Sequence, residues 1–106
     1  MLDKIFRFID ANKKYVIELT KRLVSIPTVN PPGENYERIV DLLEKTCEEI
    51  GLKTKRIRVP DNKLKKYGIS KGSKRISLVA RWDVGSKKTL HINGHYDVVP
   101  STENWT

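Results

Sequence analysis

The first half of the chain repeats hydrophobic side chains with the period of amphipathic helices. Over residues 12–26 these side chains recur three and four positions apart, which places them on one face of a helix that Pro27 ends. The members of this stripe are Tyr15, Val16, Leu19, Leu23 and Ile26. A shorter helical turn capped by Asp3 is predicted before it, with Ile5, Phe6 and Ile9 on its inward side.

A second long helix is predicted over residues 35–50, with Asn35 as its N-cap and Gly51 as the left-handed residue after its end. Its apolar stripe consists of Tyr36, Ile39, Val40, Leu43, Cys47 and Ile50. Because Cys47 lies on that stripe, a buried structural thiol is favoured over a nucleophile. The sequence T-V-N-P-P-G-E-N between the two helices excludes a helix or a central strand, so an ordered loop is expected there.

The second half of the chain changes to the two-residue alternation of β-strands. Three strands are predicted, over Lys53 to Val59, Arg75 to Asp83 and Thr89 to His95. The D-V-G-S sequence at 83–86 suits a turn, which predicts an antiparallel hairpin of the second and third strands. This order of elements predicts an α/β domain in which two N-terminal helices pack on a mixed sheet.

The charge of the chain is concentrated in one segment. The net charge is +8, and residues 53–88 carry 13 basic and 2 acidic side chains. Such a segment suits nucleic acid, an anionic membrane surface or an acidic surface of the same protein, but lysines also protect an exposed sheet edge. Tyr67 and Trp82 are the only aromatic side chains in it that could stack on bases. A solvated edge is therefore favoured, and a small nucleic-acid-binding module using residues 53–88 remains the alternative.

The length and composition add further limits. The 106 residues suffice for one small domain, and the apolar runs are too short for a membrane-spanning helix. The single cysteine cannot form an internal disulfide, and the interrupted apolar start does not resemble a secretory signal, so a cytoplasmic protein is expected.

The candidate chemistry lies in T-L-H-I-N-G-H-Y-D-V-V-P, residues 89–100. In an extended chain His91 and His95 lie roughly 13 Å apart, so they cannot share one metal ion. His95 and Asp97 point to the same side, with Cα atoms roughly 6.6 Å apart. The carboxylate can then hold one imidazole nitrogen while the other is free for a metal, although a histidine that is simply satisfied in the core would show the same spacing.

The string G-H-Y-D-V-V-P, preceded by the strand L-H-I-N, resembles the first metal-binding motif of the cocatalytic zinc amidohydrolases. This family includes acetylornithine deacetylase, succinyl-diaminopimelate desuccinylase, aminoacylase and bacterial carboxypeptidase G. The opening helix followed by L-V-S-I-P-T-V-N-P-P-G-E-N-Y is similar to the family's N-terminal region. The basic insert before the second strand most resembles the deacetylase and desuccinylase branch.

The resemblance implies that His95 is a ligand of one zinc ion and that Asp97 is the catalytic-site carboxylate that orients it. His91 matches no ligand position. The intact enzyme would use two zinc ions, or cobalt, to hydrolyse a small N-acylated amino acid or peptide, and its other ligands and its catalytic glutamate would lie beyond Thr106. Residues 1–106 are thus expected to be the N-terminal part of one metallohydrolase catalytic domain.

Several expectations follow for the chain by itself. Alone, it is expected to be inactive, to bind zinc poorly and to expose apolar surface or self-associate where the rest of its own chain would pack. Neither a membrane nor a strongly bound nucleic acid is expected as a partner. A naturally truncated, inactive reading frame is a further alternative.

Overall fold

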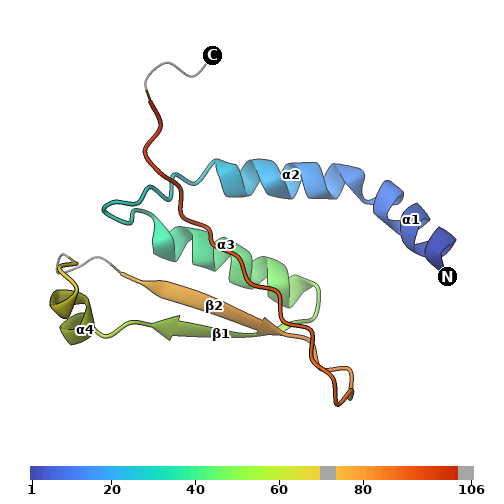
Figure 1. Ribbon diagram of the computed structural model, residues 1–106. Helices are drawn as coiled ribbons and strands as arrows, with labels where there is room; N and C mark the ends of the chain where they lie inside the picture. The colour runs from blue at the N-terminus through green and yellow to red at the C-terminus, as the bar shows by residue number, and fades with distance from the viewer. Residues whose placement is uncertain (70–73, 103–106) are drawn as a thin grey trace.

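The computed structural model describes residues 1–69 and 74–102. Its elements, in chain order, are α1 (Leu2–Ala11), α2 (Lys13–Val24), α3 (Tyr36–Glu49), β1 (Lys53–Arg58), α4 (Asp61–Lys66) and β2 (Ile76–Arg81). Strands β1 and β2 form an antiparallel sheet in which Lys53 lies opposite Arg81 and Arg58 opposite Ile76. Helix α3 lies along one face of this sheet (Figure 1). The prediction of a small α/β fold is therefore confirmed.

The core is the contact between α3 and β2. Ile39 and Val40 are 3% and 0% exposed, and they form one cluster with Ile26 and Ile76. Leu43 packs against the edge of this cluster, as the apolar stripe predicts, whereas Ile50 at the end of the stripe is exposed.

The ends of α3 follow their local signals. Gly51 has φ +86° and donates its N–H to the Glu48 carbonyl, so the left-handed end predicted at Gly51 is confirmed. Asn35 occupies the N-cap position, but its side chain donates to the Pro27 carbonyl at 2.8 Å and caps no helical N–H. The side chain of Asn35 therefore ties α3 to the preceding loop.

Helix α2 forms where the periodicity predicts it, and the short turn predicted before it is the ten-residue helix α1, on which Ile5, Phe6 and Ile9 are exposed rather than inward. Neither α1 nor α2 buries a side chain, and Figure 1 shows α1 at the end of the molecule opposite α4. Asp3 lies inside the first turn of α1, which begins at Leu2. Of the two helices expected on the sheet, that over residues 35–50 packs there as α3, whereas that over residues 12–26 does not cover the sheet and reaches the core only near its C-terminal end, where Leu23 packs against the Ile26 cluster.

The predicted strand pairing is also wrong. Strand β2 pairs with β1, and the segment from Thr89 to His95 is extended without belonging to a sheet. Leu90 and Ile92 in this segment are both 84% exposed, because no described layer covers either of them. The mixed sheet reduces to two antiparallel strands plus one isolated parallel bridge between Val29 and Val98. The basic insert between β1 and β2 contains α4, which is anchored by the buried Leu64.

The two faces of β1 divide the basic side chains. On the α3 side, Arg56 pairs with Asp41 at 2.7 Å and with Glu44, and Arg58 pairs with Glu37 at 3.0 Å. On the opposite face lie Lys53 and Lys55, here called the open-face lysines, which are exposed and take part in no ion pair of the described residues. Part of the basic segment thus meets an acidic surface of the same chain.

No helix among the described residues combines the length and apolar character needed to cross a bilayer.

Candidate functional site

The segment around residue 97 is held against the loop that follows α2. The N–H of Val98 donates to the Thr28 carbonyl at 3.0 Å, and the N–H of Asn30 donates to the Val98 carbonyl at 2.8 Å. The Thr28 hydroxyl, which is buried, donates to the Tyr96 carbonyl at 2.5 Å. These bonds join segments nearly 70 positions apart and fix the backbone from which the candidate side chains project.

Tyr96 points into the molecule and thereby turns its neighbours outward. Its hydroxyl donates to the Ile76 carbonyl, and its ring lies edge-on to the Tyr36 ring with centroids 5.1 Å apart. Burial raises the pKa of the Tyr96 hydroxyl. Because successive side chains of an extended chain point to opposite sides, His95 and Asp97 both face away from Tyr96.

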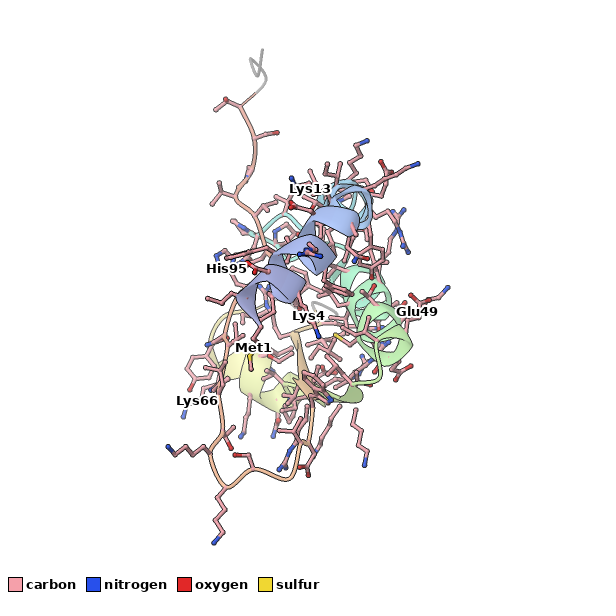
Figure 2. The ribbon with its side chains drawn as sticks, turned by 90° about the vertical axis from the view of Figure 1, so that its right-hand side faces the viewer. Met1, Lys4, Lys13, Glu49, Lys66 and His95 are labelled. Carbon is pink, nitrogen blue, oxygen red and sulfur yellow. The ribbon has the colours of Figure 1, made fainter. Side chains whose placement is uncertain are left out.

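The structure brings His95 and Asp97 together as the spacing predicts. The Nδ1 atom of His95 lies 3.0 Å from Oδ1 of Asp97 and 3.1 Å from the Asp97 carbonyl oxygen. Both of these atoms are acceptors, so Nδ1 carries a proton, and in the neutral ring Nε2 then has a free lone pair. The His95 side chain is 83% exposed, and Figure 2 shows it at the outer margin of the molecule.

Asn30 is a member of this group that the sequence did not identify. Its Nδ2 donates to Oδ2 of Asp97 at 3.0 Å. This hydrogen bond, followed by that from His95, holds the pKa of the Asp97 carboxyl below its usual value although partial burial opposes the shift. The only sequence feature that could have drawn attention to Asn30 is N-P-P-G, which predicts an ordered loop but assigns no role to its asparagine.

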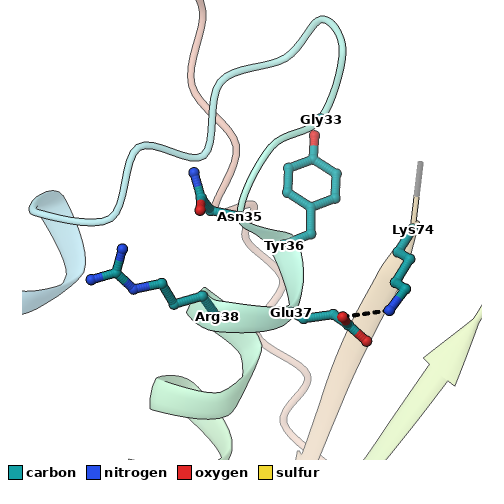
Figure 3. A pocket seen from close by; sticks show the side chains of 6 residues that line it. All are labelled: Gly33, Asn35, Tyr36, Glu37, Arg38 and Lys74. Atoms are coloured by element: carbon teal, nitrogen blue, oxygen red, sulfur yellow. Dashed lines mark hydrogen bonds and ion pairs between the residues drawn. The ribbon is translucent and has the colours of Figure 1, made fainter. Parts of the chain in front are cut away.

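The surroundings of the pair form a broad groove of 1310 Å³ between α3, β2 and the chain from 92 to 99. His95 and Asp97 line it together with mainly apolar side chains, so the imidazole adjoins a concave surface. The expected position at the end of a sheet strand is wrong, because residues 89–95 do not pair. A second hollow of 350 Å³ lies at the start of α3, where Lys74 pairs with Glu37 at 2.5 Å (Figure 3).

The described residues provide one candidate metal ligand and its orienting carboxylate. No group of three or more His, Cys, Asp or Glu side chains within residues 1–69 and 74–102 is arranged to hold a metal ion. His91 is exposed, and no hydrogen bond or ion pair among the described residues joins it to His95 or Asp97. Cys47, on the predicted stripe, is partly buried, and burial raises the pKa of its thiol, which disfavours a nucleophilic role.

Comparisons with known proteins returned no match: no family model, no curated protein and no solved structure resembles the chain closely enough to be recognised.

Proposed function

We propose that this chain supplies part of the active site of a zinc-dependent amide hydrolase that acts on N-acylated amino acids. The observation that carries the proposal is the 3.0 Å contact between Nδ1 of His95 and Asp97, which leaves Nε2 free and exposed beside a groove. A carboxylate on one imidazole nitrogen and a metal on the other is the usual environment of a metal-binding histidine. The resemblance of G-H-Y-D-V-V-P to a metal-binding motif supports the same role.

The residues of the chain have distinct tasks in this proposal. Asp97 keeps the His95 proton on Nδ1 and raises the basicity of Nε2. Asn30 keeps the second oxygen of that carboxylate occupied. The chemistry that a bound zinc ion supplies is Lewis-acid polarisation of an amide carbonyl. The apolar wall of the groove would receive the aliphatic part of an N-acyl amino acid.

One histidine does not make a metal site by itself. Catalytic zinc sites have about three protein ligands, so the remaining ligands and the general base would come from chain beyond the described residues. The described chain alone is therefore expected to be inactive and to bind zinc weakly. A cytoplasmic location belongs to the same proposal, supported by the single unpaired cysteine.

The test compares two exposed histidines that lie four residues apart. In the natural polypeptide that carries this sequence, His95→Ala should lower the zinc content and abolish hydrolysis of N-acetyl and N-succinyl amino acids, while His91→Ala should leave both nearly unchanged. Hydrolysis should also stop when a chelator removes the metal. Hydrolysis that survives the chelator, or equal losses in the two variants, would overturn the proposal.

The nucleic-acid-binding alternative rests on a separate observation, the open-face lysines. They lie beside Ile57 and Val79, which are 49% and 47% exposed, so this face of the sheet presents both charge and apolar surface. No aromatic side chain belongs to this face of the two strands, so it lacks the base stacking that proteins binding single strands combine with positive charge. The alternative is tested by the salt dependence predicted in the Discussion.

A further inference from the structure

A chain of polar contacts extends from Arg75 through Asn30 and Asp97 to His95. Nη2 of Arg75 donates to Oδ1 of Asn30 at 3.3 Å, and Nδ2 of Asn30 donates to Oδ2 of Asp97 at 3.0 Å. The last contact joins Oδ1 of Asp97 to Nδ1 of His95 at 3.0 Å. The four side chains come from three segments that only the fold brings together.

Arg75, the first residue in this series of contacts, is held on several sides. Nη2 of Arg75 also donates to the Pro32 carbonyl at 3.0 Å, and the guanidinium lies over the Tyr36 ring, 5.1 Å from its centroid. Gly33 has φ +101°, and a Cβ atom at this position would overlap the guanidinium. Figure 3 shows Tyr36 rising from the first turn of α3 toward Gly33. Arg75 therefore presents its donor to Asn30 from a fixed position.

The chemistry of the neighbours determines the orientation of the Asn30 amide. An arginine only donates hydrogen bonds, and an ionised carboxylate only accepts them. Asn30 must therefore turn Oδ1 toward Arg75 and Nδ2 toward Asp97, and the reversed amide would face a donor with a donor and an acceptor with an acceptor. An aspartate of the same shape at position 30 would place one carboxylate against another.

We infer that Asn30 is a positioning residue that, held by Arg75, sets the rotamer of Asp97 and through it the tautomer of His95. With Oδ2 tied to Asn30, Oδ1 of Asp97 is directed at Nδ1 of His95. This inference rests on the proposed function, in which His95 needs a free Nε2, but it concerns a contact that can be measured without metal or substrate.

The experiment is ¹⁵N NMR of the imidazole rings in the 106-residue chain, at a pH well above the ordinary range for histidine titration. The wild-type His95 should be mainly protonated on Nδ1. Asp97→Ala and Asn30→Ala should both shift the population toward protonation on Nε2, while His91 serves as an internal reference. Asn35→Ala is the matched control, because it removes another asparagine hydrogen bond from the same loop without touching Asp97.

Each outcome decides between the inference and the proposed function. A shift in Asn30→Ala without one in Asn35→Ala supports the inference. A shift in Asp97→Ala with none in Asn30→Ala overturns the inference and leaves the His95 and Asp97 pair of the proposed function intact. No shift in Asp97→Ala would mean that the Asp97 carbonyl alone holds the ring, which overturns both the inference and the orienting role proposed for the carboxylate.

A second variant covers the case in which Asn30→Ala does not fold. Arg75→Met keeps an unbranched side chain that can pack on Tyr36 but removes the donors to Asn30 and Pro32. It should shift the His95 tautomer in the same direction as Asp97→Ala, by a smaller amount, because Asn30 then loses its fixed partner. A folded Arg75→Met chain with the wild-type tautomer would overturn the part assigned to Arg75.

Discussion

Ile76 is the position at which a single substitution best tests the packing of this fold. It is 4% exposed at the start of β2 and contacts the cluster formed by Ile26, Ile39 and Val40. Val79 is its matched control: it lies three residues further along the same strand, on the opposite face, and is 47% exposed. Substitution of either residue by alanine changes the same strand, but only one change creates a cavity in the core.

The two substitutions should differ several-fold in cost. Ile76→Ala removes three buried carbons, about 2.4 kcal/mol at about 0.8 kcal/mol each, and the cavity raises the loss of unfolding free energy to about 3–4 kcal/mol. Val79→Ala removes two carbons that are half exposed, so about 0.8 kcal/mol is expected. Ile76→Val, which removes one carbon, should cost about 1 kcal/mol.

The assay is urea unfolding followed by circular dichroism, with the free energy taken from the midpoint and slope. Because the buried core is small, Ile76→Ala is expected to leave much of the chain unfolded without denaturant, and Ile76→Val then provides a measurable value. A cost of Ile76→Ala as small as about 0.8 kcal/mol would refute the packing of α3 on the face of the sheet that holds Ile76. A cost of Val79→Ala as large as about 3 kcal/mol would instead mean that the open face of the sheet is covered in solution.

Two further predictions concern charged side chains. A hydrogen bond from Lys74 lowers the pKa of Glu37, and one from Arg56 lowers the pKa of Glu44. The two ionised glutamates therefore stabilise the fold at pH values above the ordinary glutamate pKa, and this stabilisation is lost as the pH falls through their lower folded-state pKa values. Unfolding free energies measured from neutral pH down to about pH 3 should therefore decline, and Glu44→Gln should flatten that decline; an unchanged slope would contradict the assignment. Nucleic-acid binding is expected to be weak and to vanish with salt because it would depend on the open-face lysines, and binding that survives about 0.5 M salt in a filter or anisotropy assay would contradict this.

The elements that the sequence predicted well depend on local signals. Helices α2 and α3 appear from hydrophobic periodicity, and the ends of these helices follow from Pro27 and Gly51, whose effects act within a few residues. The pairing of His95 with Asp97 is equally local, because two residues of extended chain bring their side chains to one side. In each case the determining groups lie within one turn or one strand of each other.

The features that the sequence did not predict depend on tertiary contacts. Strand β2 pairs with β1 rather than with the segment from Thr89 because α3 covers both strands. The arginines of β1 pair with acidic side chains of α3. Asn30 lies 67 positions from Asp97, and no spacing rule joins them. Contacts between their two segments, among them the backbone bridge of Val29 with Val98, place both side chains in one group.

The exposed surface of the chain leads to a final prediction, that two or more copies associate. The accessible surface is 9652 Å², whereas a compact monomer of 12.3 kDa exposes roughly 6100 Å². The radius of gyration, 17.1 Å, likewise exceeds the roughly 13 Å expected for 106 residues. The excess, roughly 3500 Å², is as large as the interfaces of obligate complexes. It includes the apolar stripe of α1, with Phe6 58% exposed. Sedimentation velocity should therefore show association that increases with concentration and that Phe6→Glu weakens, whereas a compact monomer at high concentration would contradict the prediction.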